Sequence, residues 1–327
     1  MKKVARITGF AIGAILLVVL GVLGYIKFAL PDVGPPPDLK VDATQARLER
    51  GEHLAMYGMG CLHCHSSHDK MAFMHPANGP LGAGQADFIP GVATPNLTPT
   101  GIGDWSDGEL FRAITTGVSK DGRALHPVMP YDNFGQADPE DIYAVIAYLR
   151  TLKSAGQVQA KPSFDFPFYF IVNTMPEKRT PGKRPDSSDT LAYGQYLVMS
   201  ASCAHCHVQR DDKGAPIPGT EFTGGMAFEQ PNGTVCYTAN LTPCPETGLG
   251  KWTKADFIKR FKSYADYEGK HLPLKNGEFN TEMPWVGFSH LSEEDLGAMY
   301  TYLHSLKPVK HSVEKYRKVD PKMVAAN

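Results

Sequence analysis

The most continuous apolar stretch of the chain is at its N-terminus, at residues 7–26. It contains no charged residue, follows three basic residues and ends at Lys27. A run of about 20 apolar residues is long enough to cross the hydrocarbon core of a bilayer as a helix. Signal peptides usually have a shorter apolar region and a small-residue cleavage site, and no clear site follows Lys27. We therefore expect residues 1–30 to form an uncleaved membrane anchor, with a removed signal peptide as the alternative.

The residues that flank this stretch predict an orientation. Lysine and arginine next to a spanning helix stay on the cytoplasmic side, so the rest of the chain would be exported. In a Gram-negative bacterium this arrangement places the protein in the inner membrane, with its domains in the periplasm. Residues 31–41 contain four prolines and are expected to form a stiff, extended spacer.

Beyond the spacer, apolar residues recur with helical spacing in two matched sets of three segments. Ser106, Thr253 and Ser292 are expected N-caps, and Pro139 suits the first position of a helix. No convincing strand alternation is visible, and the connections are rich in glycine and proline. The sequence thus predicts an all-α fold, with helices at 42–58, 106–116, 138–152, 189–201, 253–265 and 292–306.

Several short motifs occur twice, in the same order. An Asn-Leu-Thr-Pro segment begins at Asn96 and again at Asn240, a Gly-x-Gly-x-Trp segment ends at Trp105 and Trp252, and a Met-Pro-aromatic segment begins at Met129 and Met283. This order predicts two tandem domains, a proline-rich linker between them and a C-terminal tail. Their expected ranges are 42–153 and 189–307 for the domains, 154–188 for the linker and 308–327 for the tail.

Composition is consistent with two loop-rich domains. The chain has 327 residues, of which 32 are glycine and 26 are proline, and its formal net charge is −1. Such a charge gives no bulk attraction to nucleic acid, so no nucleic-acid partner is expected. Loop-rich domains of this kind often wrap a large cofactor that completes their apolar core.

Each predicted domain carries a Cys-x-x-Cys-His motif directly after its first helix. A zinc site needs four ligands gathered on one ion, whereas each motif belongs to its own complete copy of the repeat. A thioredoxin-like redox site expects a βαβ context, which the pattern does not show. The motif is also that of c-type haem attachment, in which both sulfurs bond one porphyrin and the histidine faces the iron. We therefore predict two covalently bound haem c, attached at Cys61, Cys64, Cys203 and Cys206, with His65 and His207 on the irons.

Each haem iron then needs a sixth ligand. Met129 and Met283 occupy the same place in the two copies, between the Asn-Leu-Thr-Pro segment and the last helix. The proline after each keeps the chain extended, as a strap across a haem face requires. The alternative is that both methionines are ordinary core residues.

Together these motifs resemble the class I cytochrome c family. They are similar in particular to the cytochrome c subunits of membrane-bound alcohol and gluconate dehydrogenases and to related membrane-anchored dihaem cytochromes. The resemblance implies histidine and methionine on each iron, that is, His65 with Met129 and His207 with Met283. Dehydrogenase subunits of this family often carry three haem domains, whereas this chain has two.

Further residues between the ligand segments are candidates for contact with the haem edge. Asparagine and tryptophan side chains can donate hydrogen bonds to propionates, and a basic side chain can offset propionate charge. Turn formation and surface solvation are the alternatives. The candidates are Asn96, Trp105, Arg123, Asn240, Trp252 and Lys270.

Two cysteines remain, Cys236 and Cys244, both in the second copy. In an oxidising compartment a disulfide between them is expected. The rival is a thiolate that ligates iron, as in dihaem thiosulfate dehydrogenases, but Met283 already fills that position.

A His/Met ligand pair saturates the iron and raises its potential, which favours electron transfer over catalysis. We expect a carrier with no catalytic residue, acting between a periplasmic dehydrogenase or quinol-oxidising complex and another cytochrome or a terminal oxidase. The alternative is a dihaem enzyme, either a thiosulfate dehydrogenase or a cytochrome c peroxidase.

Overall fold

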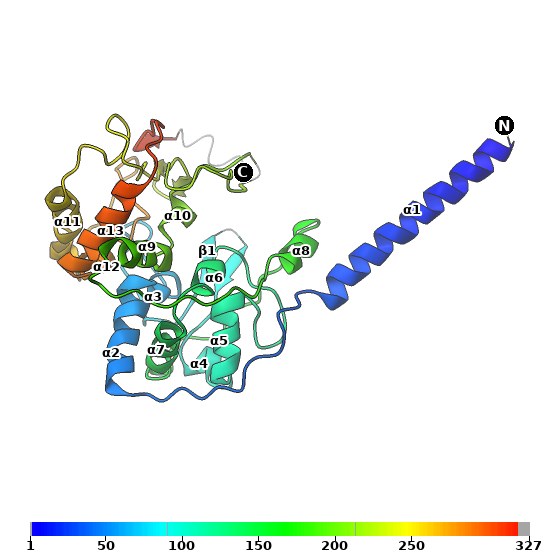
Figure 1. Cartoon of the computed structure of the whole chain (residues 1–327), viewed down its shortest axis with the longest axis horizontal. Helices are drawn as coiled ribbons and strands as arrows, with labels where there is room; N and C mark the ends of the chain where they lie inside the picture. The colour runs from blue at the N-terminus through cyan, green and yellow to red at the C-terminus, as the bar shows by residue number, and fades with distance from the viewer. Residues whose placement is uncertain (1, 90, 213, 320–327) are drawn as a thin grey trace.

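The computed structural model describes residues 2–89, 91–212 and 214–319. Two helical bodies lie against each other, and one long helix, α1 (Lys2–Ala29), extends away from them (Figure 1). Within Lys3–Ala29, the most apolar 18-residue window has a mean hydropathy of 2.5, and none of that window is buried. Length and composition allow this helix to cross a membrane, and a signal sequence would have the same properties.

The first body begins where Thr44 caps a helix by accepting a hydrogen bond from the backbone N–H of Arg47. Its last turn widens into a π-helical turn, a local form that is rare in helices. Ser106 and Glu109 form a reciprocal capping box at the second long helix. The elements are α2 (Gln45–His53), η1 (Leu54–Gly58), α3 (Cys61–Cys64), α4 (Pro99–Ile102), α5 (Asp107–Thr116), α6 (Tyr131–Phe134) and α7 (Pro139–Leu149).

The second body repeats this plan. Asp189, Thr253 and Ser292 each accept a backbone hydrogen bond from the first turn of a helix, so the caps expected at Thr253 and Ser292 are confirmed. All six expected helices are present, with ends that differ by a few residues. The elements are α9 (Thr190–Ser200), α10 (Cys203–Cys206), α11 (Lys254–Lys262), η3 (Ala265–Tyr267), α12 (Trp285–Ser289) and α13 (Glu293–Ser305).

Each body has its own apolar core. Leu62, Ile142 and Ile146 are fully buried in the first, and Leu296 and Leu303 in the second. In both, the helix before the Cys-x-x-Cys-His motif packs on the last helix, so α2 lies against α7 and α9 against α13. The two cores therefore rest on equivalent helix pairs.

The expectation of a fold without strands is wrong. Two strands, β1 (Gln85–Ile89) and β2 (Val92–Thr94), form an antiparallel hairpin in the first body. The second body has an antiparallel sheet of β3 (Ala227–Gln230), β4 (Thr234–Tyr237) and β5 (Tyr316–Lys318). These strands have three to five residues each. Alternation over so few positions is hard to recognise in a sequence, and β5 comes from the C-terminal tail.

The linker also contains short helical turns, α8 (Phe168–Ile171) and η2 (Val172–Thr174). Both contact α1. In Figure 1, α8 lies near the end of the long helix that faces the two bodies.

Two candidate haem-attachment sites

Each Cys-x-x-Cys-His motif forms a single helical turn after a sharp change of direction. Gly60 and Ser202 precede these turns in the left-handed conformation, with φ of 66° and 54°. Glycine adopts this conformation without strain, whereas serine has a steric cost. The turn places the two cysteines three positions apart on one short helix, and the following histidine stands at its C-cap.

Both of these histidines are buried and oriented in the same way. His65 and His207 are each 8% exposed. The ring Nδ1 of His65 lies 2.8 Å from the carbonyl oxygen of Pro95, and Nδ1 of His207 lies 2.7 Å from that of Ala239. A carbonyl only accepts, so Nδ1 carries the proton and donates. The Nε2 lone pair is then available to a metal, as in most histidine metal ligands.

Electrostatics keep these imidazoles neutral. Burial lowers the pKa of His65 and of His207, and the hydrogen bonds to Pro95 and Ala239 oppose this effect only in part. Metal ligation requires the neutral ring. Neutral charge, fixed tautomer and a free Nε2 together fit an axial iron ligand.

The four cysteines of the motifs are not thiolates in this environment. Burial raises the pKa of the Cys61, Cys64 and Cys203 thiols to about 12, and that of Cys206 to about 11. Redox-active and zinc-binding cysteines are thiolates with lowered pKa values. Moreover, no group of three or more His, Cys, Asp or Glu side chains gathers at a metal-binding distance within the described part of the chain. The donor set fits thioether attachment of haem better than zinc or disulfide exchange.

The two methionine segments have the same local structure. Met129 packs against the first core together with Cys61, and Met283 packs against the second core together with Cys203. After each methionine a proline caps one helical turn, α6 or α12. The structure thus brings each methionine to the same core as the attachment cysteines of its own copy.

The expectation that Asn96 and Asn240 bind propionates is not supported. Both N–H groups of Asn96 are used, because its Nδ2 donates to the carbonyls of Ala155 and Gln157 at 2.7 and 3.2 Å. In the second copy, Nδ2 of Asn240 donates to Val309 O at 2.9 Å and Thr247 Oγ1 at 3.1 Å.

The Oδ1 atoms of these asparagines are engaged as well. Each accepts from both the backbone N–H and the hydroxyl of the threonine two positions later. Asn96 and Asn240 therefore join the loop before α4, or its counterpart, to the chain that follows the last helix of the same body.

The two basic candidates differ from each other. The Nε of Arg123 is buried and has no hydrogen-bond partner, which leaves a donor for an anionic group such as a propionate. Lys270 is exposed, and its Nζ lies over the ring of Tyr267, 5.7 Å from the centroid. Only Arg123 therefore has the environment expected of a haem-edge residue.

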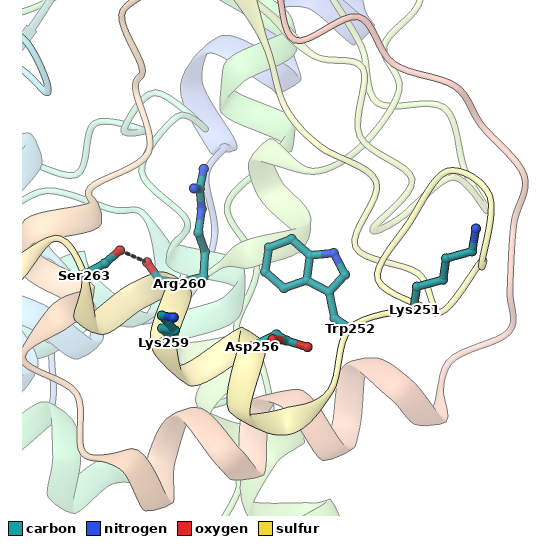
Figure 2. A pocket seen from close by; sticks show the side chains of 6 residues that line it. All are labelled: Lys251, Trp252, Asp256, Lys259, Arg260 and Ser263. Carbon is teal, nitrogen blue, oxygen red and sulfur yellow. Dashed lines mark hydrogen bonds between the residues drawn. The ribbon is translucent and has the colours of Figure 1, made fainter.

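The two candidate tryptophans, Trp105 and Trp252, are partly buried, and each packs against the apolar core of its own body. Trp252 also borders an open surface depression of about 540 Å³. In the view of Figure 2, its indole ring lies between the side chains of Arg260 and Lys251. The other lining residues are Asp256, Lys259, Arg260 and Ser263. The propionate-binding role of the two indole N–H groups stays a prediction.

The expected disulfide between Cys236 and Cys244 is absent, and both are free thiols. Cys236 lies on β4, where its Sγ accepts from Gln230 Nε2 at 3.7 Å. The thiol of Cys244 donates to Glu246 Oε2 at 3.2 Å in the neighbouring loop. The prediction relied on the oxidising compartment, whereas in the structure the strand and the loop carry the two thiols to different partners.

A buried polar group beside Met283 was not predicted. His75, 6% exposed, places Nε2 at 2.9 Å from Gln230 Oε1 and Nδ1 at 3.3 Å from Glu282 Oε2. Gln230 donates to Glu282 at 2.8 Å, so both His75 nitrogens face acceptors. Burial raises the pKa of Glu282, but the bond to His75 and its charge outweigh this effect and hold that pKa below its ordinary value. The group joins the two bodies, and no motif in the sequence signals it.

Comparisons with known proteins agree with this geometry. The family model for cytochrome c matches residues 48–153 and 191–307. The gluconate 2-dehydrogenase cytochrome c subunit of Pantoea cypripedii is 29% identical over 90% of this chain and 65% of its own length. The cytochrome c subunit of alcohol dehydrogenase (quinone) from Gluconacetobacter polyoxogenes is 27% identical over 84% of this chain and 59% of its own length.

A shorter relative is matched over nearly its whole length. A diheme cytochrome c-type protein of Cereibacter sphaeroides is 26% identical over 84% of this chain and 90% of its own length. The chain therefore spans about three fifths of the length of the two dehydrogenase subunits, but most of a dihaem cytochrome. Two family matches and two equivalent attachment turns mean that the chain carries two covalently bound haem c, and it belongs to the cytochrome c family.

Proposed function

We propose that this protein is a membrane-anchored dihaem cytochrome that passes electrons from a periplasmic dehydrogenase or quinol-oxidising complex to another cytochrome or a terminal oxidase. Its relatives include cytochrome c subunits of gluconate, alcohol and fructose dehydrogenases, which supports a role in electron transfer. Bound haem c supplies one-electron redox chemistry.

The observation that carries the proposal is the equivalence of the two sites. In each copy a buried histidine donates Nδ1–H to a carbonyl, and a Met-Pro strap packs on the same core as the attachment cysteines. A matched pair of saturated irons suits a relay of electrons, whereas an enzyme needs an open coordination position on one iron. The residue assignments in this proposal are thioether bonds at Cys61, Cys64, Cys203 and Cys206, with His65/Met129 and His207/Met283 on the irons.

At the level of architecture, the proposal is two tandem class I cytochrome c domains, at 42–153 and 189–307. Residues 31–41 are the spacer, 154–188 the linker and 308–327 the tail. Helix α1 anchors the protein in the inner membrane, with the N-terminus in the cytoplasm and the haem domains in the periplasm. The basic residues before the apolar run support this orientation.

The alternative of a thiosulfate dehydrogenase is less well supported. It needs a cysteine ligand on one iron, but the thiols of Cys236 and Cys244 contact Gln230 and Glu246. A peroxidase needs an open position, which a methionine strap in both copies does not leave.

The ligand assignment is tested by near-infrared spectroscopy of the oxidised full-length protein, in which a methionine–iron charge-transfer band reports each His/Met haem. Met129→Leu and Met283→Leu keep an apolar side chain of similar size but remove the sulfur. Each variant is expected to lose about half of the band, because one of two equivalent haems loses its ligand.

Two other methionines provide matched controls. Met56 and Met199 also pack on the first core, and Met56→Leu and Met199→Leu are expected to keep the whole band. If Met129→Leu or Met283→Leu kept the full intensity of the band, the substituted methionine would not be an iron ligand. A high-spin haem in the unaltered protein would instead favour an enzyme.

A further inference from the structure

The linker exposes a group of large apolar side chains. Phe166 is 77% exposed, Ile171 44%, Tyr169 41% and Met175 37%. Phe166 and Tyr169 both contact the ring of Phe170, with centroids 6.2 and 5.3 Å apart, so these rings form one patch. Apolar groups gathered at one place on a surface usually mark a binding surface.

The position of this patch beside α1 indicates what covers it. Both α8 and η2 contact α1. Leu23 and Ile26, near the end of α1, are only partly exposed, whereas Leu17 and Leu20 are 73% and 65% exposed. The patch therefore lies beside the last turns of the apolar helix, where Lys27 marks the expected boundary of the hydrocarbon core. Figure 1 shows α8 at this end of α1, on the side of the two bodies.

The residue types of the patch and its flanks also suit contact with a membrane surface. Aromatic rings are enriched at the level of lipid headgroups, and apolar side chains of interfacial segments enter the acyl boundary. Exposed Lys178 and Lys183 follow the patch and suit anionic lipids. Two acidic residues are nearby, exposed Asp165 and Glu177, and the latter is paired with Arg179 at 3.2 Å.

The opposite side of the segment packs on the first haem domain. The ring of His126 lies 5.7 Å from that of Phe164 and 5.6 Å from that of Phe168. The backbone N–H of Met129 donates to the carbonyl of His126 at 3.1 Å. The inward-facing rings thus contact the start of the methionine strap, while Phe166 and Tyr169 face outward.

We propose that residues 164–175 rest on the bilayer surface as a second membrane contact beside α1 and hold the methionine strap of the first domain on the membrane side. The inference rests on the proposed membrane anchor and goes beyond it. A spanning helix followed by a spacer leaves the domains free to rotate over the membrane, whereas a second contact selects one orientation. The haem of the first domain then faces partners in the membrane.

The test uses the full-length protein with both haems reduced, in vesicles of phosphatidylcholine and phosphatidylglycerol. A nitroxide label is placed at Phe166→Cys, with Met175→Cys as a second position in the same segment. Ile217→Cys is the matched control, because Ile217 is an apolar residue of the second domain that is 39% exposed. Leu17→Cys reports whether α1 is in the bilayer, and the unsubstituted protein gives the background from Cys236 and Cys244.

Electron paramagnetic resonance then compares collisions of each label with oxygen, which partitions into lipid, and with a water-soluble nickel chelate. The ratio of oxygen to nickel collisions is expected to be several-fold higher at positions 166 and 175 than at 217, and to approach the ratio at 17. If the collision ratios at positions 166 and 175 equal that at position 217, while the label at position 17 is in lipid, the second membrane contact is wrong and the anchor stands. If 17 is also in water, both the inference and the anchor fail.

Discussion

Asp141 shows how much one buried carboxylate contributes to the contact between the two bodies. Its side chain is 2% exposed and is bound by Arg50 of α2 at 2.9 and 2.8 Å. Arg184 of the linker donates to it at 2.7 Å, and so does the hydroxyl of Tyr196 in the second body, also at 2.7 Å. One residue thus connects both bodies and the linker, and a fully satisfied network of this kind favours one arrangement.

The substitution Asp141→Asn is expected to lower the free energy of unfolding by about 2 kcal/mol. That figure lies below the roughly 3–5 kcal/mol for breaking a fully buried pair, because the side chains of Arg50 and Arg184 are 25% and 41% exposed. Urea unfolding followed by haem absorbance measures the change. Glu140→Gln is the matched control: Glu140 is the preceding residue, its side chain is 62% exposed, and loss of its pair should cost less than about 1 kcal/mol. Equal effects of the two substitutions would contradict this role for Asp141.

The pKa of Asp141 predicts that the stability of the fold depends on pH. Burial raises the pKa of Asp141, but the hydrogen bond and charge of Arg50, the bond from Tyr196 and the charge of Arg184 outweigh burial and hold this pKa below its ordinary value of 3.8. A carboxyl with a lowered pKa stabilises the fold above its unfolded-state pKa and loses that contribution as the pH falls. The stability difference between the natural protein and Asp141→Asn should therefore be constant above about pH 5 and shrink below pH 4. A difference that grew on acidification would contradict this assignment.

Among the elements, two equivalent helix crossings depend on glycine. A Cβ on Gly51 of α2 would lie 1.9 Å from the carbonyl oxygen of Ala144 in α7, and one on Gly194 of α9 would lie 2.0 Å from that of Ala298 in α13. Backbone atoms at this distance cannot move aside as a flexible side chain can. Each helix pair therefore approaches closely only because these positions lack a side chain.

Gly194→Ala is expected to destabilise the second domain by about 3 kcal/mol, at the upper end of the usual cost of overpacking. The matched control is Gly297→Ala on α13, where a Cβ would lie 3.5 Å from the Lys254 side chain, an ordinary contact. Replacing that helical glycine should stabilise the protein by about 0.4–1 kcal/mol. Thermal unfolding monitored at the haem absorbance measures both effects. Similar melting curves for the two variants would show that the α9–α13 contact can relax.

At the scale of the whole molecule, a segment of the first body pairs with one of the second. The N–H of Phe73 donates to Leu272 O at 2.9 Å, and the N–H of Leu274 donates to Met71 O at 2.8 Å. Asn280, which is fully buried, accepts from the N–H of Met74 at 2.9 Å. Together with the Asp141 network, these contacts hold the two haem domains in a fixed relative position.

Asn280→Ala is expected to open this pairing, because it leaves the partly buried N–H of Met74 without an acceptor, at a cost of about 1–3 kcal/mol. Hydrogen exchange should become faster at the amides of Phe73, Met74 and Leu274, by roughly tenfold or more for each 1.4 kcal/mol lost.

Asn232→Ala is the matched control for this experiment. Asn232 is also fully buried, but its Nδ2 donates to the carbonyl oxygen of Glu278 within the second body, at 2.7 Å. The control should leave the amide of Phe73 protected. Faster exchange at Phe73 in the control, or unchanged exchange at Met74 in Asn280→Ala, would contradict the role of Asn280.

The accuracy of the sequence-based predictions follows the range of the interactions involved. The caps at Ser106, Thr253 and Ser292 were predicted because a cap bonds the first turn of its own helix. The hairpin and the three-stranded sheet were missed because short strands have a weak pattern and β5 pairs from the far end of the chain. Asn96 and Asn240 were candidates for propionate contact, with turn formation as an alternative, because their partners, the carbonyls after the last helix, cannot be recognised in the sequence.

The sequence by itself determined the two Cys-x-x-Cys-His turns and the apolar N-terminal helix, since each depends on near neighbours in the chain. It also determined the duplication and the matched methionines, because the same short motifs recur in the same order. Only the tertiary structure decided which carbonyls orient His65 and His207, how Asp141 and Asn280 join the two bodies, and that Cys236 and Cys244 are separate. These contacts link residues distant in sequence or on different elements. Their partners depend on how the complete chain packs, so no local pattern specifies them.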